Sequence, residues 1–190
     1  DQKKVDSQSR VNTFAHVNHT AEDPRLGVLL CINGTGILNA WTRRLLGDLS
    51  YVEMNEQAAS VEAGSEGLSV LPFGNGAERV LNNRNIGAQI VGLDLNRHGR
   101  GHLCRAVQEG IVFSFMYGIE IMADADMPIH TIRAGDANMF MSSIFSQSLA
   151  NISAAQIELY DTDGALGAAR GAGVGVGLYE SLEQAFFTLE

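Results

Sequence analysis

The stretch AQIVGLDLNRHGRGHLCRAVQE, residues 88–109, leads into the longest helix that the sequence predicts, from Gly99 to Met122. Apolar or small residues recur there every three or four positions: Leu103, Ala106, Val107, Gly110, Phe113, Tyr117 and Ile121. This spacing is typical of a helix that buries one face. The pattern therefore predicts one helix of several turns, and the rest of the chain can be placed before and after it.

Shorter elements surround this helix. We predict strands over residues 11–17, 26–32, 68–73, 129–132 and 155–160, and helices over residues 37–46, 51–61 and 138–150. Residues 74–87, rich in Gly, Asn and Arg, are predicted to form a surface loop. Thr162 and Asp163 are typical of the N-cap of a further helix, made almost entirely of Ala and Gly. Strands followed by alternating helices and strands predict a layered α/β domain with helices on its sheet.

The composition is that of an ordinary globular domain. The 190 residues are 45% hydrophobic and 18% charged, which is enough for one buried core and predicts a single domain over residues 1–190. The net charge of −9 argues against a nucleic-acid partner, because no Lys-rich or Arg-rich run could neutralise a phosphate backbone. No apolar run approaches the roughly 20 residues that span a bilayer, so we expect no membrane partner.

The cysteines and the first residues bear on the cellular compartment. Cys31 and Cys104 are far apart in the sequence and have no CxxC spacing, so both are predicted to be reduced residues of the core. The opening DQKKVDSQSR does not resemble a signal peptide, and it begins as if cut from a longer chain. We therefore expect a cytoplasmic protein and a chain that is part of a larger one.

The segment GVLLCINGTGILNAW, residues 27–41, runs from an apolar strand through a turn at Asn33–Gly36 into a helix with the only Trp. Two interpretations stay open for this turn. The unpaired N–H groups of a strand-to-helix turn can hold an anion. Alternatively, Gly with a positive φ and a hydroxyl N-cap make an ordinary tight turn. A P-loop is excluded in either case, since the segment has no Lys.

Other candidate sites are weaker. The Gly/Ala segment of residues 164–177 does not fit the spacing G-x-G-x-x-G, and we interpret it as a helix whose small residues allow close packing. His16 and His19 would point to opposite faces of a strand, so no metal site is expected there. Asp124 and Asp126 are interpreted as solvated loop carboxylates. The serines of residues 142–148 form a polar helix face without a G-x-S-x-G elbow. The sequence thus contains no complete catalytic constellation.

Residues 88–109 resemble the second signature of the FGGY family of carbohydrate kinases. The residues that meet this signature are Ala88, Ile90, Gly92, Leu93, His102, Leu103, Ala106, Val107 and Glu109. Gln108 departs from it, because the family usually has an aliphatic residue there. Further stretches follow in the family's order: Arg10-Val11 with Phe14 and His16, Gly36 before Trp41, and Leu71-Pro72-Phe73 with Glu78-Arg79. The closing segment of residues 163–186 is similar to the xylulokinase branch.

The resemblance implies the C-terminal, nucleotide-binding domain of an FGGY sugar kinase, with the N-terminal domain absent. The implied fold is actin-like and ribonuclease-H-like, with helices packed on a mixed sheet. The implied cofactors are ATP and Mg²⁺. Gly36 corresponds to a glycine that touches ATP, and Asn138 to an asparagine beside the adenosine. Ala134 or Gly135 would face the adenosine, and an Ala there narrows the approach by a methyl group.

The resemblance also implies what this chain lacks. The family's catalytic aspartate and most sugar contacts lie upstream, so no residue here matches the base and the fragment alone is expected to be inactive. The implied reaction of the whole enzyme is phosphoryl transfer from ATP to a sugar, with D-xylulose as the favoured substrate. The alternative is a degenerate, non-catalytic actin-like module with a binding or regulatory role. The exposed face of the long helix could support a homodimer.

Overall fold

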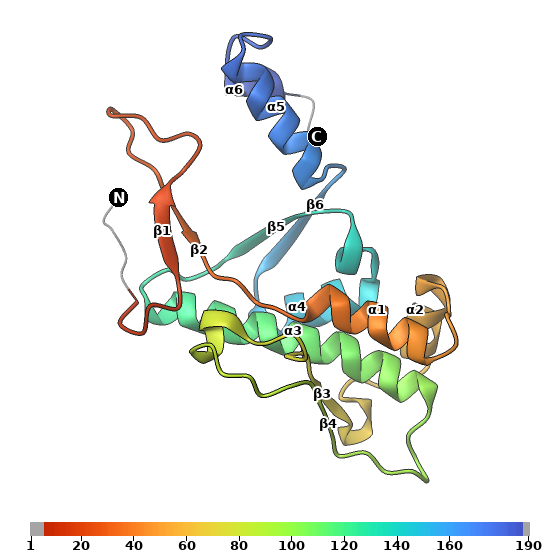
Figure 1. Ribbon diagram of the computed structural model, residues 1–190. Helices are drawn as coiled ribbons and strands as arrows, with labels where there is room; N and C mark the ends of the chain where they lie inside the picture. Colours follow the sequence, from red (N-terminus) through yellow and green to blue (C-terminus); the bar gives the residue numbers. More distant parts are fainter. Residues whose placement is uncertain (1–5, 188–190) are drawn as a thin grey trace. The chain divides into compact units, whose positions relative to one another are not determined.

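The computed structural model describes residues 6–187 (Figure 1). Residues 1–5, which begin the segment DQKKVDSQSR, and residues 188–190 lie outside the described part. The chain divides between Ile129 and His130 into two compact units, and each unit is described by itself.

The first unit contains two antiparallel strand pairs. β1 (Asn12–Ala15) pairs with β2 (Leu26–Leu29), and β3 (Ser69–Leu71) pairs with β4 (Gln89–Val91). The predicted strands at residues 11–17, 26–32 and 68–73 are confirmed. β4 was not predicted, because it has only three residues and all of them are exposed, so no alternation of buried and exposed positions marks it.

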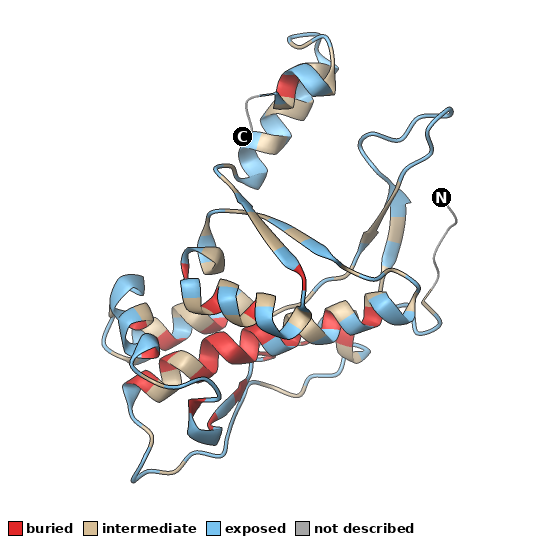
Figure 2. Ribbon diagram, turned by 180° about the vertical axis from the view of Figure 1, so that it is seen from behind, coloured by how far each residue is buried: buried red, intermediate tan, exposed pale blue. Residues whose placement is uncertain are grey.

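Three helices complete the framework of the first unit: α1 (Thr35–Leu45), α2 (Tyr51–Ala59) and α3 (Arg100–Asp124). The predicted long helix is α3, which packs against α2 and β3. Buried residues are concentrated along α3, as Figure 2 shows. α2 begins at a capping box, in which Ser50 and Glu53 each accept a hydrogen bond from the other's backbone N–H.

Two residues of the signature, His102 through its backbone carbonyl and Glu109 through its carboxylate, hold α3 to the segment before β3. The ring Nδ1 of His102 accepts the backbone N–H of Gly99 at 3.1 Å, and the carbonyl of His102 accepts the Ser65 hydroxyl at 2.6 Å. About two turns further, the buried carboxylate of Glu109 accepts the backbone N–H of Gly64 at 3.0 Å and pairs with Arg105. These residues of the signature therefore have a structural role here.

The departure at Gln108 also has a physical account. This side chain is only 1% exposed, and its Nε2 donates a hydrogen bond to Oδ1 of Asn55 on α2 at 3.0 Å. A buried amide is tolerated when it is hydrogen-bonded. Asn55 supplies such a partner at the contact between α2 and α3.

The structure corrects two expectations about the first unit. Residues 74–87 are not a surface loop throughout, because a 3₁₀ turn, η2 (Glu78–Leu81), places Val80 in a core cluster with Phe73, Ala77 and Ile121. Cys31 is exposed, whereas Cys104 is buried as predicted. Cys31 lies beyond the end of β2, where its side chain alternates with the half-buried Leu30 and Ile32.

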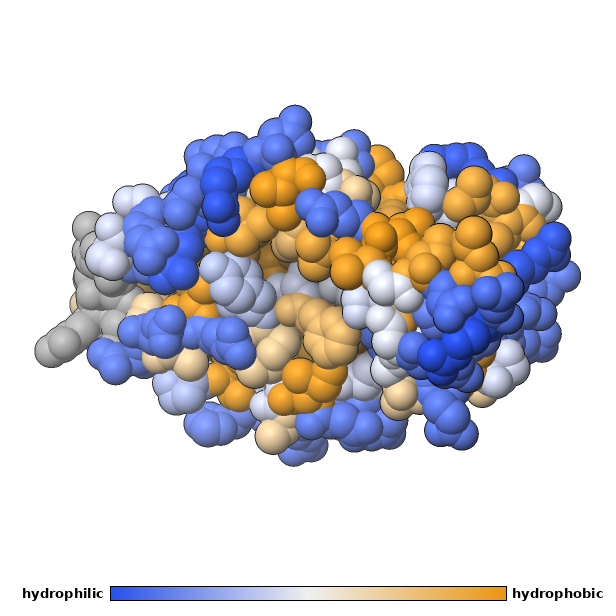
Figure 3. All heavy atoms as spheres, turned by 90° about the horizontal axis from the view of Figure 1, so that it is seen from below, coloured by the Kyte–Doolittle hydropathy of each residue, from blue (hydrophilic) through white to orange (hydrophobic). Residues whose placement is uncertain are grey.

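Several hydrophobic side chains of the first unit are exposed. They lie on β3, on β4 and on the segment after β4: Leu71, Ile90, Val91, Leu93 and Leu95. Figure 3, a view from below, shows hydrophobic side chains at the surface between hydrophilic ones.

The second unit is built on a parallel strand pair, β5 (Thr131–Gly135) and β6 (Gln156–Tyr160). η3 (Asn138–Met141) and α4 (Ser143–Ser153) connect the two strands, and α5 (Gly164–Gly175) and α6 (Leu182–Phe186) follow. Asp163 caps α5 as predicted, since its carboxylate accepts the N–H of Leu166 at 2.8 Å. In residues 6–187 the strands thus form three two-stranded sheets, two antiparallel and one parallel, and the α/β class is confirmed.

The helix predicted from Asn138 begins later than expected. Asn138 has a φ of +53°, and Ser142 is extended and interrupts the helical path. The Ser142 hydroxyl instead accepts the N–H of Phe145 and caps α4. Serine at this position therefore acts as an N-cap and not as part of a polar helix face.

Candidate functional site

The turn before α1 depends on Gly34. This residue is buried and is the N-cap of α1, with a φ of +89°. A Cβ at this position would overlap the carbonyl oxygen of Pro72. Of the tight-turn interpretation, the positive φ is therefore confirmed and the hydroxyl cap is wrong: Thr35 is the first residue of the helix, and α1 has no side-chain cap. The first turn of α1 keeps N–H groups that no side chain satisfies, which is the arrangement that an anion could use.

Gly36 lies one residue into α1 and is exposed. No heavy atom lies within 4 Å of the position that a Cβ would occupy there, apart from the local backbone. The fold therefore does not need glycine at this position for packing, and a ligand could reach the backbone. Its role at ATP stays a prediction.

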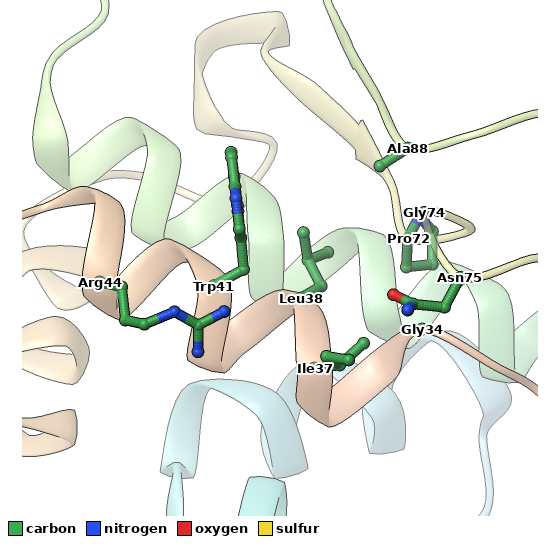
Figure 4. Close-up of a pocket in the computed structure, with 9 residues that line it drawn as sticks. All are labelled: Gly34, Ile37, Leu38, Trp41, Arg44, Pro72, Gly74, Asn75 and Ala88. Carbon is green, nitrogen blue, oxygen red and sulfur yellow. The ribbon is translucent and has the colours of Figure 1, made fainter.

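A cavity of about 360 Å³ lies beside α1 in the first unit (Figure 4). It is lined by Gly34, Ile37, Leu38, Trp41, Arg44, Pro72, Gly74, Asn75 and Ala88, so Gly36 is not part of its wall. Figure 4 shows the amide of Asn75 directed toward the start of α1. Most of the wall is apolar, and Trp41 is 42% exposed. A cavity of this kind has room for a small ring system.

A second hollow, of about 390 Å³, lies in the second unit at the carboxyl ends of β5 and β6. Its wall consists of Arg133, Ala134, Gly135, Tyr160, Thr162, Asp163 and Gly164. The structure thus places Ala134 and Gly135, two of the predicted site residues, on the wall of one hollow. Ligands of open α/β folds commonly bind at this end of parallel strands.

The fold explains why glycine follows Ala134. A Cβ at Gly135 would overlap the carbonyl oxygen of Thr162, so only glycine allows the end of β5 to meet the turn after β6. The contribution of Thr162–Gly164 to the hollow was not predicted beyond the helix cap. These residues reach the hollow because Gly135 in β5 pairs with Tyr160 in β6, and the two paired residues are 25 positions apart along the chain.

The charged side chains on the wall of the hollow, Arg133 and Asp163, differ in their hydrogen-bond partners. The Arg133 guanidinium donates to the Glu158 carboxylate at 2.7 Å, and the Tyr160 hydroxyl donates to the same oxygen at 2.9 Å. Both hydrogen bonds, that from Arg133 first, hold the pKa of Glu158 below its ordinary value. Arg133 is therefore already paired, whereas the exposed Asp163 carboxylate has one hydrogen bond, from the N–H of Leu166.

Asn138 follows the hollow and is not part of its wall. Its side chain is exposed on the left-handed residue that opens η3, so the amide is open to a ligand. Within residues 6–187, no group of three or more His, Cys, Asp or Glu side chains could hold a metal ion. No helix in the same range is long and apolar enough to cross a membrane.

Comparison with known proteins gives a consistent result. The sequence matches the model of the FGGY family of carbohydrate kinases, C-terminal domain, over residues 1–176, a range that includes both compact units up to α5. It is 33% identical over 151 residues to the L-xylulose/3-keto-L-gulonate kinase of Escherichia coli (strain K12), covering 76% of this chain and 28% of that protein. It is 27% identical over 188 residues to the xylulose kinase of Bacillus subtilis (strain 168), covering 97% and 36%.

Solved structures have the same fold. A ligand-bound xylulose kinase from Lactobacillus acidophilus aligns with a TM-score of 0.78 and 24% identity, covering 100% of this chain and 38% of that one. A xylulose kinase from Bifidobacterium adolescentis aligns with a TM-score of 0.69 and 27% identity, covering 94% and 34%. The predicted actin-like, ribonuclease-H-like fold is confirmed. The chain spans between 24% and 36% of the length of the curated relatives that it matches.

Proposed function

Because this chain belongs to the FGGY family of carbohydrate kinases, as the C-terminal domain, we propose that it is the nucleotide-binding half of an enzyme that transfers the γ-phosphate of ATP to a sugar hydroxyl. The observation that carries the proposal is the hollow of the second unit, which has Ala134 and Gly135 on its wall. These are the residues that the resemblance assigns to the adenosine. The proposed site thus coincides with a cavity of suitable size.

Four residues of this chain would hold the nucleotide. Ala134 and Gly135 would lie against the adenosine, and the exposed amide of Asn138 can both donate to it and accept from it. Gly36 would let the phosphates approach the backbone at the start of α1, where no side chain occupies the N–H groups.

The chain is proposed to bind the nucleotide without transferring the phosphoryl group. ATP supplies that group, and Mg²⁺ offsets the charge of its phosphates. The residues described here offer no cluster for a metal, so we assign no protein ligand to Mg²⁺. We also propose that the base lies in the N-terminal half, because none of the carboxylates of this chain matches it. The 190 residues alone should therefore leave ATP intact in the presence of sugar.

For the whole enzyme we propose a ketopentose, D-xylulose first, as the phosphoryl acceptor. The support comes from the similar proteins, whose names include xylulose kinase and L-xylulose/3-keto-L-gulonate kinase. Turnover of ATP by the chain joined to its N-terminal half, measured with D-xylulose, L-xylulose and glycerol, tests this choice. Faster turnover with glycerol than with either xylulose would reject it. The predicted homodimer and cytoplasmic location stay predictions.

Nucleotide binding is tested by calorimetric titration of the 190-residue chain with ADP. We expect Asn138→Asp to weaken binding about tenfold or more, because the new carboxylate loses the donor half of the amide and repels the phosphates. Asn82→Asp is the matched control, since Asn82 is also exposed with a φ of +55° but lies in the first unit, at the C-cap of η2. Its affinity should stay within twofold of the wild type.

The same titration tests whether the chain binds a nucleotide at all and whether Asn138 takes part. If the unaltered chain binds no ADP at millimolar concentration, the proposal of a nucleotide-binding half is wrong. If Asn138→Asp and Asn82→Asp weaken binding equally, the nucleotide does not use Asn138.

A further inference from the structure

The turn between β6 and α5, residues 162–164, lines the hollow of the second unit, and neither the resemblance nor the family match gives it a role. We infer that this turn is the second wall of the nucleotide site and that it binds the nucleoside part, ribose and base, and not the phosphates. This inference rests on the proposed function, because it names further residues of the same site.

Hydrogen bonds fix the turn to the residues proposed to face the adenosine. The carbonyl of Tyr160 accepts the N–H of Asp136 and the N–H of Thr162, each at 2.8 Å. Gly135 lies directly against the carbonyl of Thr162, an approach that is possible only because glycine has no Cβ. A ligand that lies on Ala134 and Gly135 in this hollow therefore also meets residues 162–164, since the two segments are joined at the rim.

The charges around the hollow favour a neutral ligand group with hydrogen-bond donors. The charge of the only cation on its wall, Arg133, is offset by the Glu158 carboxylate 2.7 Å away, so the wall has no excess positive charge that would favour a phosphate. Asp163 adds a carboxylate that has lone pairs left after its bond to Leu166. A phosphate beside this carboxylate would be repelled, whereas ribose hydroxyls can donate to it.

Gly164 gives a steric test of this wall. It lines the hollow, and the position of a Cβ there has no heavy atom within 4 Å apart from the local backbone. A valine at 164 should therefore fit the folded chain while reducing the space for a ligand. Gly167 lies one turn further along α5, also has open space at its Cβ position, and does not line the hollow. It is the matched control for the same substitution.

The experiment titrates ADP and adenosine into the wild-type chain, Gly164→Val and Gly167→Val, after circular dichroism and thermal unfolding have shown that all three are folded. We expect Gly164→Val to weaken both ligands tenfold or more and Gly167→Val to leave both within twofold of the wild type. Equal affinities of Gly164→Val and wild type for ADP would overturn the inference and leave the proposed function intact. Failure of the wild type to bind ADP would overturn both.

A second variant tests the polarity of the wall. Asn is as good an N-cap as Asp, so Asp163→Asn keeps the cap of α5 and removes the charge. We expect adenosine to bind about fivefold more weakly to Asp163→Asn, while inorganic tripolyphosphate binds no more weakly than to the wild type. Weaker binding of tripolyphosphate with unchanged binding of adenosine would place the phosphates at this turn and overturn the assignment to the nucleoside.

Discussion

The two glycines of the turn Asn33–Gly36 should respond differently when each is replaced by alanine. Gly34→Ala should destabilise the chain by about 3 kcal/mol or more, because alanine would be strained at a φ of +89° and its Cβ would overlap the Pro72 carbonyl. Gly36→Ala should be neutral or stabilise by up to about 1 kcal/mol, since α1 is helical there and the space is open. Urea unfolding followed by circular dichroism measures both changes.

The pair of variants is its own control, because the same methyl group is added two residues apart. Equal unfolding free energies for Gly34→Ala and Gly36→Ala would contradict the described path of the turn. A loss of ADP binding in Gly36→Ala at unchanged stability would support its proposed role. At this scale the sequence predicted that the turn needs glycine, but the requirement of Gly34 depends on Pro72, a contact between residues far apart in the chain that no local pattern contains.

At the scale of elements, we predict an energetic coupling between two residues at the contact of α2 and α3. Gln108 and Asn55 are joined by one hydrogen bond between these helices. A double-mutant cycle with Gln108→Leu and Asn55→Ala should give a coupling energy of about 0.5 to 1.5 kcal/mol in urea unfolding, the net value of a partly buried hydrogen bond. The cycle cancels the apolar burial that leucine at 108 gains against residues other than Asn55, because this contribution is present with either residue at position 55.

Glu56 provides the control for this cycle. It is next to Asn55 on α2, but its side chain is exposed. Gln108→Leu combined with Glu56→Ala should show a coupling of less than about 0.5 kcal/mol. If both cycles give the same coupling, the hydrogen bond does not explain why this chain departs from the signature at residue 108.

Elements with a strong local signal were predictable from the sequence, and those without one were not. The 25-residue helix α3 follows its apolar spacing, and α5 follows its Asp163 cap. β4 has no pattern, because its three residues are all exposed and are defined only by pairing with β3. The start of α4 was misplaced, since Ser142 also fits a polar helix face and only the backbone angles of Asn138 and Ser142 show that the helical path is interrupted there.

At the scale of the whole molecule, the candidate site shows what a sequence can and cannot predict. The resemblance selected Ala134 and Gly135, and the structure places both on the wall of a hollow. The second wall, residues 162–164, was predicted only as the start of a helix. Its place beside Gly135 follows from parallel pairing of β5 and β6, and strand pairing is a property of the folded chain. The resemblance thus indicated candidate site residues, whereas only the folded structure shows which residues lie side by side.

The acid stability of the whole chain is the last prediction. Several carboxyl groups have a pKa below the ordinary value because the folded chain donates hydrogen bonds to them: Asp6, Glu53, Glu66, Glu158 and Glu183. A group whose pKa is lower in the folded chain stabilises it above the unfolded pKa, and this contribution is lost as the pH falls through the folded pKa. The free energy of unfolding should therefore decrease steadily below about pH 5.

Asp6 has the largest identified effect and can be tested alone. The side chain of Arg10 donates two hydrogen bonds to its carboxylate, at 2.7 and 3.0 Å, and these lower the pKa of Asp6 from 3.8 to about 2. Asp6→Asn should be less stable than the wild type at pH 7, and the difference should shrink as the pH falls from about 4 toward 2, where wild-type Asp6 is protonated too. Urea unfolding of the wild type and Asp6→Asn at pH 7, 5, 4 and 3 measures this difference, and parallel curves for the two chains would show that the pair with Arg10 does not contribute to acid sensitivity.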